Sequence, residues 1–127
     1  MRIGRENSCF SITKIDPQDP YSAYRVEAAA AGEGFQVRGI HEVVTLPSSP
    51  SVLAEFADFE SRKNNLLELR ISEGGWLRFK RNIRGTIVFH YRLCRWQLGA
   101  AFEGEIIVDG EFATDLCREL KSLLEAN

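Results

Sequence analysis

Apolar and polar residues alternate almost without interruption between Leu66 and Val108. Successive side chains of a β-strand point to opposite faces of a sheet, so a period of two indicates strands with one buried and one exposed face. Turn-forming residues interrupt the alternation at Ser72–Gly75 and Asn82–Gly85. The stretch therefore predicts an antiparallel meander with its apolar side chains in the core and its polar side chains on an outer row.

A further break is needed between Thr86 and Val108, because one strand of that length would measure about 76 Å. The phase of the alternation slips between Leu93 and Trp96. A tight hairpin at Cys94–Arg95, which places Leu93 opposite Trp96, explains the slip. Cys-Arg is a poor sequence for such a turn, so a longer loop or a bulge is the alternative.

Three strands and two helices are expected outside this stretch. The strands are expected at 9–15, 24–31 and 35–44. The first helix is expected over about 13 residues from Ser49, and the second from Gly110 to about Glu125. Each helix carries an apolar stripe, formed by Val52, Leu53, Phe56 and Phe59 in the first and by Phe112, Leu116, Leu120 and Leu123 in the second.

The resulting order, β-β-β-α-β-β-β-β-α with short connections, predicts an α+β fold. We expect two layers: an antiparallel sheet of about seven strands, and two helices packed on one of its faces. The other face of the sheet is expected to stay partly open. The 127 residues are expected to form a single domain, 1–127, in which residues 1–8 are a loosely ordered N-terminal arm.

Composition indicates a folded cytoplasmic protein. Hydrophobic residues make up 44% of the chain and charged residues 27%, as in ordinary globular domains. The longest apolar run, Ala28–Ala31, is far shorter than the roughly 20 residues of a membrane span, and the N-terminus does not read as a signal peptide. Three widely spaced cysteines without a CxxC pair favour reduced thiols over a disulfide framework.

The outer row of the alternating stretch is basic. From Leu66 to Arg95 the chain holds seven Lys and Arg residues and two acids, a balance of +5, which leaves −7 for the rest of a chain whose formal net charge is −2. The candidate partner-binding residues on this row are Trp76, Arg78, Lys80, His90 and Arg92. Cations interleaved with an aromatic ring can bind nucleic acid or a protein, and the acidic balance of the whole chain favours a protein.

Residues that often carry chemistry form no catalytic or metal-binding set. His90 and Cys94 lie on one strand about 13 Å apart, too far for a hydrogen bond between their side chains. His41–Glu42 lacks the second histidine of a zinc-binding HExxH helix. Gly32–Gly34 joins two strands and does not open a helix, so it predicts a hairpin turn and not a phosphate loop. The sequence therefore predicts no catalytic residue, no metal and no cofactor.

Four features between about Cys9 and Leu124 form a recognisable pattern. They are a tyrosine-rich entry to the second strand, a phenylalanine-rich first helix, the hairpin sequence ISEGGWLRF at Ile71–Phe79, and a leucine-rich last helix. In this pattern the chain resembles small bacterial proteins of uncharacterised families, some of which are similar to immunity proteins encoded beside contact-dependent, polymorphic toxins. The resemblance implies a non-enzymatic protein that caps a cognate toxin. Such capping faces are often acidic, whereas the strand face here is basic, so a toxin would have to bind the acidic helices or be acidic itself.

Three functions follow as hypotheses. The first is a cytoplasmic, non-enzymatic protein-binding domain, immunity-like, that holds a partner on the open sheet face. The alternative is a nucleic-acid-binding module that uses the same basic face. A third is an enzyme or small-ligand carrier with a pocket between the helix at 49–63 and the sheet. Trp76, Val88 and Ile107 on the outer row are also candidates for a homodimer patch.

Overall fold

The chain folds into two four-stranded antiparallel sheets and two α-helices. A computed structural model describes residues 1–5, 8–15, 23–32, 35–45, 50–95 and 100–125. The first sheet contains β1 (Arg2–Arg5), β2 (Ser8–Lys14), β3 (Ala23–Gly32) and β4 (Phe35–Thr45). The second contains β5 (Leu66–Arg70), β6 (Trp76–Arg81), β7 (Ile87–Arg95) and β8 (Ala100–Val108). Helix α1 (Pro50–Glu60) joins the sheets, the short 3₁₀ helix η1 (Ser72–Gly74) joins β5 to β6, and α2 (Gly110–Glu125) follows β8.

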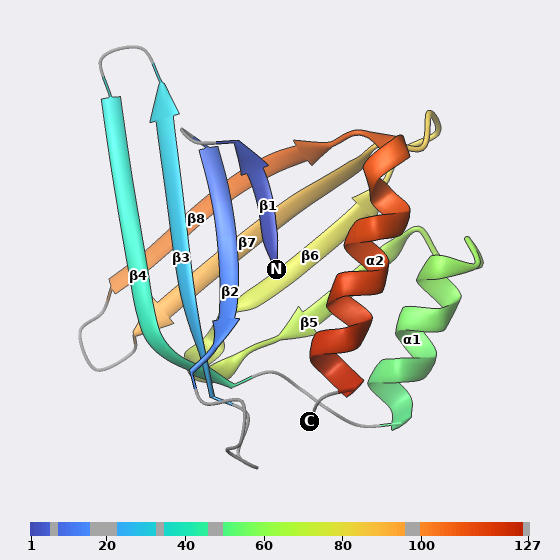
Figure 1. Ribbon diagram of the computed structural model, residues 1–127, viewed down its shortest axis with the longest axis horizontal. Helices are drawn as coiled ribbons and strands as arrows, with labels where there is room; N and C mark the ends of the chain where they lie inside the picture. The colour runs from blue at the N-terminus through green and yellow to red at the C-terminus, as the bar shows by residue number, and fades with distance from the viewer. Residues whose placement is uncertain (6–7, 16–22, 33–34, 46–49, 96–99, 126–127) are drawn as a thin grey trace.

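The first sheet and both helices lie on the same side of the second sheet (Figure 1). Strands β2, β3 and β4 cross in front of β7 and β8, and α1 and α2 stand side by side next to them. The ring of Phe10 on β2 lies 4.9 Å from that of Phe89 on β7, which shows that the two sheets pack face to face. The second sheet thus has a covered inner face and an outer face whose described side chains are exposed or partly exposed, apart from Cys94 near the end of β7.

The α+β class and the antiparallel pairing are confirmed, but the single sheet of about seven strands is wrong. Each strand pairs with its chain neighbours, except that β4 leads into α1 and does not pair with β5. Alternation decides which face of a strand is buried and leaves open which layer buries it. Part of the inner face that we expected helices to cover is therefore covered by a second sheet.

Residues 2–5, expected within a loosely ordered arm, form strand β1 and pair with β2. Ile3 is only 3% exposed. Gly4 has a φ of +93°, which favours glycine, and a Cβ atom there would overlap the carbonyl oxygen of Ser8. This strand has one buried apolar side chain, which is too few to produce a readable alternation in the sequence.

Aromatic side chains from both sheets form the centre of the core. The Phe89 ring lies 4.9 Å from Phe10 and 4.7 Å from Phe79, and Tyr91 stacks on Phe102 at 6.0 Å. These are the distances at which aromatic pairs gain energy beyond simple burial. Burial also raises the pKa of the Tyr91 hydroxyl above its ordinary value.

Both predicted helices form, and α1 has 11 residues instead of about 13. The described side chains that they bury are Phe56, Phe59, Leu116, Cys117 and Leu120. The hydroxyl of Tyr24 on β3 donates a hydrogen bond to the carbonyl of Leu123 at 3.1 Å, which ties the end of α2 to the first sheet. Neither helix, over the part that is described, combines the length and the apolar character needed to cross a membrane.

The tight hairpin expected at Cys94–Arg95 is wrong, and the longer connection is right. Leu93 pairs with Phe102, and the last pair is Arg95 with Ala100, so residues 96–99 connect the strands. The expected turn at 94–95 and the connection at 96–99 both contain an even number of residues. Both therefore shift the phase of the alternation in the same way. Trp96 and Leu98, which were expected to point inward, lie outside the described residues.

The three cysteines differ in exposure, which predicts the order in which they react with a thiol reagent such as DTNB. Cys9 is partly exposed, whereas Cys94 and Cys117 are buried. Burial raises the pKa of the Cys117 thiol, an effect that the charge of Arg81 partly offsets, and the thiolate is the reactive form. At about pH 8 we expect one fast-reacting thiol per folded chain and two more after denaturation. The variant Cys9→Ser should lose the fast reaction, and a fast thiol that persists in it would contradict this order.

Candidate functional site

The polar row predicted for the meander forms the outer face of the second sheet. Strand register places its side chains in three rows that run across β5, β6, β7 and β8. The rows are Leu66, Lys80, Val88 and Ile107; then Glu68, Arg78, His90 and Glu105; then Arg70, Trp76, Arg92 and Glu103. None of these residues is buried, whereas Leu67, Leu77 and Phe89 between them are at most 1% exposed. The structure therefore brings all five predicted residues, Trp76, Arg78, Lys80, His90 and Arg92, together on the two central strands of one face.

Trp76 is the centre of a packed group of side chains on the outer face. The guanidinium carbon of Arg78 lies 3.7 Å from the centroid of the Trp76 ring. The His90 ring meets the same indole edge-on, with centroids 4.7 Å apart and planes at 89°. Arg78 Nε donates a hydrogen bond to Glu68 Oε2 at 2.8 Å. The cation–π contact and the ion pair hold Arg78 in one orientation, and we call these four residues the Trp76 cluster.

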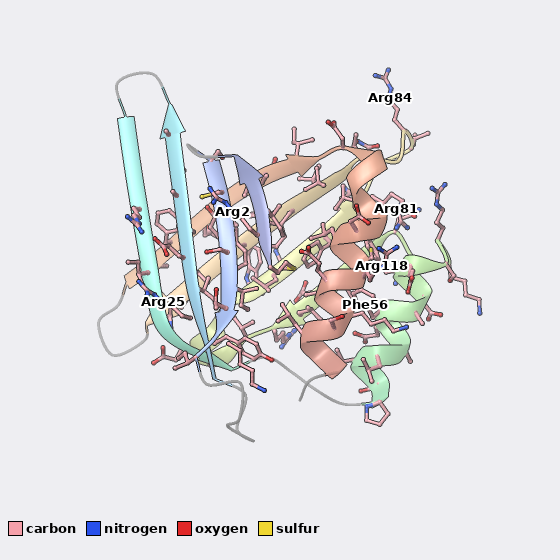
Figure 2. The ribbon with its side chains drawn as sticks, in the orientation of Figure 1. Arg2, Arg25, Phe56, Arg81, Arg84 and Arg118 are labelled. Carbon is pink, nitrogen blue, oxygen red and sulfur yellow. The ribbon has the colours of Figure 1, made fainter. Side chains whose placement is uncertain are left out.

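The outer face carries a nearly balanced charge, not the strongly basic one that the sequence suggests. Its charged side chains are the cations Arg70, Arg78, Lys80 and Arg92 and the carboxylates Glu68, Glu103 and Glu105, which leaves +1 with His90 neutral. Strand β8 supplies two of the carboxylates, directly opposite Arg92 and His90. Arg81 belongs to the other side of the sheet, where it donates a hydrogen bond to the Phe59 carbonyl at 2.7 Å. Arg84 extends away from the turn between β6 and β7 (Figure 2).

Strand β7 keeps His90 and Cys94 apart, whereas Cys94 lines a small pocket together with His41. His90 packs against Trp76, whereas Cys94 is buried farther along β7. Among the described residues there is no group of three or more His, Cys, Asp or Glu side chains placed to hold a metal ion. The outer face presents one indole, one imidazole and several ion-pairing groups, which are side chains suited to contact with a partner.

A contact between His41 and Glu73 links the two sheets, and we did not predict it. His41 is 6% exposed on β4, and its Nε2 lies 2.9 Å from Glu73 Oε2 in η1. Its Nδ1 is buried and has no hydrogen-bond partner among the described residues. The two residues are 32 positions apart in sequence, so only the packing of the sheets reveals the pair.

A groove of about 450 Å³ lies between α1 and β5, where we considered a small-ligand pocket. It is lined by Val52, Glu55, Asn64, Leu66, Leu67, Glu68 and Arg70. Of these, Glu68 is already engaged by Arg78, at 2.8 Å, and by Arg70, at 3.7 Å. These lining residues include no histidine, cysteine or lysine. The groove could hold a small molecule, but its lining offers no general base or nucleophile of those three types.

Comparison with known proteins finds no relative. No protein-family model matches the chain, and no curated protein and no solved structure matches it. The geometry of the outer face is therefore what bears on the function of this chain.

Proposed function

We propose that this chain is a non-enzymatic protein-binding domain that holds a partner on its outer face, in the manner of an immunity protein that neutralises a toxin. The observation that supports this best is the Trp76 cluster, in which an indole and a guanidinium are held in contact on an uncovered sheet face. Tryptophan and arginine are among the residues most enriched in binding hot spots. Their position on β6, a central strand of the sheet, gives a partner contacts on every side of them.

The Trp76 cluster is ordered before any partner arrives. Immobilising a free, rotamer-rich side chain on binding costs about 0.5–1.5 kcal/mol. Here Arg78 is already held between Glu68 and Trp76 in the folded chain. Most of the entropy of immobilising this side chain is therefore lost during folding and not during binding. A preorganised anchor of this kind favours tight association with a rigid partner surface.

The carboxylates of β8 favour a protein over a nucleic acid as the partner. Glu103 and Glu105 lie opposite Arg92 and His90, where a phosphate backbone would meet negative charge. A mixed-charge face instead pairs with a protein surface of complementary pattern. The nucleic-acid alternative requires affinity that falls steeply with salt and is lost when Arg78, Lys80 and Arg92 are changed to glutamate. Binding to DNA or RNA with both properties would replace our proposal.

The toxin-neutralising role is tested by co-expression with the product of the neighbouring gene. We expect a complex that survives purification and, where that product is toxic, cells that survive its expression. A product that neither binds nor is neutralised would contradict the immunity-like role. A homodimer would instead occupy the outer face through Trp76, Val88 and Ile107. Sedimentation of the chain alone measures its oligomeric state and distinguishes such a dimer from a face that is free to bind a partner.

The variant Trp76→Ala is expected to weaken partner binding by at least about 30-fold, because truncation of a hot-spot residue costs about 2 kcal/mol or more. It also removes the ring that holds Arg78. Titration of the purified partner by calorimetry measures the effect. Arg84→Glu is the control, since this cation lies in the turn between β6 and β7, outside the rows of the outer face. The affinity of this variant should stay within about twofold of the wild type. Equal affinities for the wild type and Trp76→Ala would contradict the assignment.

A further inference from the structure

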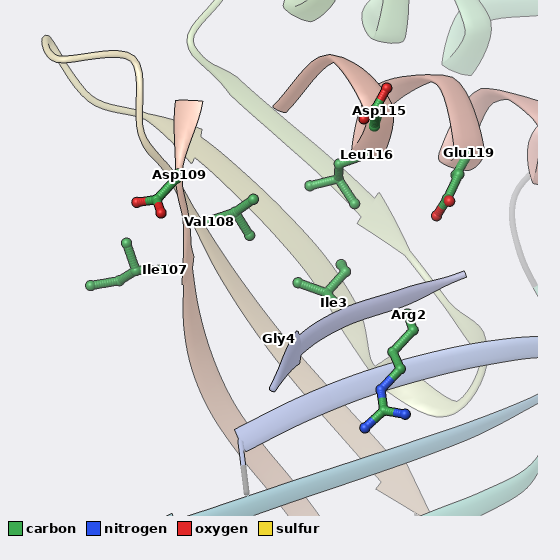
Figure 3. Close-up of a pocket in the computed structure, with 9 residues that line it drawn as sticks. All are labelled: Arg2, Ile3, Gly4, Ile107, Val108, Asp109, Asp115, Leu116 and Glu119. Carbon is green, nitrogen blue, oxygen red and sulfur yellow. The ribbon is translucent and has the colours of Figure 1, made fainter. Parts of the chain in front are cut away.

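A second surface, a groove of about 530 Å³, lies beside the end of β8, and none of the Trp76 cluster lines it. It opens between β1, the end of β8 and helix α2 (Figure 3). Its lining residues are Arg2, Ile3, Gly4, Ile107, Val108, Asp109, Asp115, Leu116 and Glu119. The three elements come from opposite ends of the chain, so the groove exists only in the folded protein.

The floor of the groove is apolar. Ile3 and Leu116 are 3% and 6% exposed, and Figure 3 shows them directed toward one another with Val108 beside them. Ile107 stands at the margin and is 69% exposed, an unusual value for a large apolar side chain. A ligand that fits this floor must present apolar groups to it.

One wall of the groove is a strand edge with which no other described strand pairs. β1 is the outermost strand of its sheet, and it lies between β2 and the groove. Met1 and Ile12 exchange two hydrogen bonds of 2.9 Å, so antiparallel alternation directs the backbone N–H and C=O of Arg2 away from β2. Free N–H and C=O groups on a sheet edge are a template for an added strand.

The rim of the groove is acidic. Asp109, Asp115 and Glu119 line it, and of these only Asp115 has an ion-pair partner among the described residues, Arg118 at 3.3 Å. The remaining charged lining residue is Arg2, whose side chain points away from Leu116 and Val108 in Figure 3. In the part of the chain that the structure describes, Asp109 and Glu119 therefore line the groove without an ion-pair partner.

We propose that this groove binds an extended, basic segment of a partner protein, which adds as a strand along β1. Alternate side chains of the segment would pack on Ile3 and Leu116, and the intervening lysines or arginines would pair with Asp109 and Glu119. The proposal deepens the proposed function, because it names the chemistry of a second contact made by the same partner. The mixed-charge outer face and the acidic groove would then grip different parts of that protein.

A labelled hexapeptide of alternating lysine and valine tests the groove directly, with its glutamate–valine counterpart as the charge control. By fluorescence anisotropy we expect the lysine peptide to bind and the glutamate peptide to bind at least about tenfold more weakly. Methylation of the backbone nitrogens on the hydrogen-bonding edge of the lysine peptide should abolish binding, because an added strand needs those donors. Equal binding of both charge forms, or no binding of the lysine peptide up to about 1 mM, would overturn the proposal.

The groove variant is Asp109→Asn with Glu119→Gln, which keeps a good capping residue before α2. We expect it to bind the lysine peptide at least about tenfold more weakly. The matched control is Glu103→Gln with Glu105→Gln, which removes the same charge from the outer face and should change the affinity less than about twofold. If the control weakens binding as much as the groove variant does, the lysine peptide does not bind in the groove and the proposal is overturned. A dimer of the chain that blocks peptide binding would overturn it as well.

The peptide test and the partner test can fail separately. Trp76→Ala should leave peptide binding unchanged, because Trp76 does not line the groove. If the wild-type chain binds its partner but not the lysine peptide, the groove proposal is rejected and the proposal for the outer face is unaffected. Loss of partner binding in Trp76→Ala with normal peptide binding would support two separate contacts.

Discussion

Replacing Gly104 with alanine is expected to destabilise the fold by about 2–4 kcal/mol. Gly104 on β8 pairs directly with Tyr91 on β7, and a Cβ atom built at Gly104 would overlap the hydroxyl and the ring of that tyrosine. The Tyr91 side chain cannot easily move aside, since it is 1% exposed and its ring lies 5.1 Å from Phe10 and 6.0 Å from Phe102. Relief of the overlap must therefore shift either the aromatic core or strand β8.

Urea denaturation followed by tryptophan fluorescence measures this loss. Glu105→Ala on the same strand is the control, because its side chain is exposed and its removal should cost no more than about 0.5 kcal/mol. In the double variant with Tyr91→Leu, the smaller side chain leaves room for the new methyl group. We expect the double variant to lose less unfolding free energy than Gly104→Ala and Tyr91→Leu lose together, by at least about 1 kcal/mol. Strict additivity would show that Tyr91 is not what limits the space at Gly104.

Phe89→Ala is expected to cost about 3–5 kcal/mol, because it leaves a cavity where the two sheets meet. The Phe89 ring lies 4.9 Å from Phe10 across the sheet interface and 4.7 Å from Phe79 on the neighbouring strand. Its removal takes contacts from both sheets at once. A loss of this size would approach the whole stability of a small domain, which is about 5–15 kcal/mol.

The control for Phe89→Ala is its chain neighbour, Val88→Ala. Val88 lies on the outer face and is partly exposed, so its truncation should cost less than about 1 kcal/mol. Comparison of the two urea transitions tests the assignment of inner and outer faces on β7. Similar losses at the two positions would contradict the packing of one sheet on the other.

The outer face was predictable because it depends on local geometry. Trp76, Arg78 and Lys80 occupy alternate positions of one strand, and alternation alone places them on the same side. The two turns that flank β6 carry glycine and asparagine, which mark the strand ends. The structure places His90 and Arg92 beside them because β7 pairs with β6 in the expected antiparallel way.

The charge balance of that face was less predictable, because it depends on register. Glu103 and Glu105 neutralise part of the face only because β8 pairs with β7 through a connection at 96–99. The sequence alone supported two connections with different partners for Leu93. A strand pairing set by a turn of uncertain length is the kind of feature that alternation cannot settle.

The groove and the contact between His41 and Glu73 were not predictable. Each joins elements far apart in the chain: β4 with η1 in one case, and β1 with β8 and α2 in the other. The free edge of β1 arises because the chain forms two sheets where we expected one. No local pattern distinguishes these arrangements, since both bury the same alternating side chains.

By itself, the sequence determined the order of most strands and both helices, the buried face of each strand in the meander, and the group of side chains around Trp76. These features follow from backbone periodicity and turn chemistry, which act over a few residues. Only the tertiary structure decided that the strands divide into two sheets, that β8 balances the charge of the outer face, and that an acidic groove opens beside β1. Those features depend on contacts between segments that are distant in the sequence. Such contacts form only when the layers pack together.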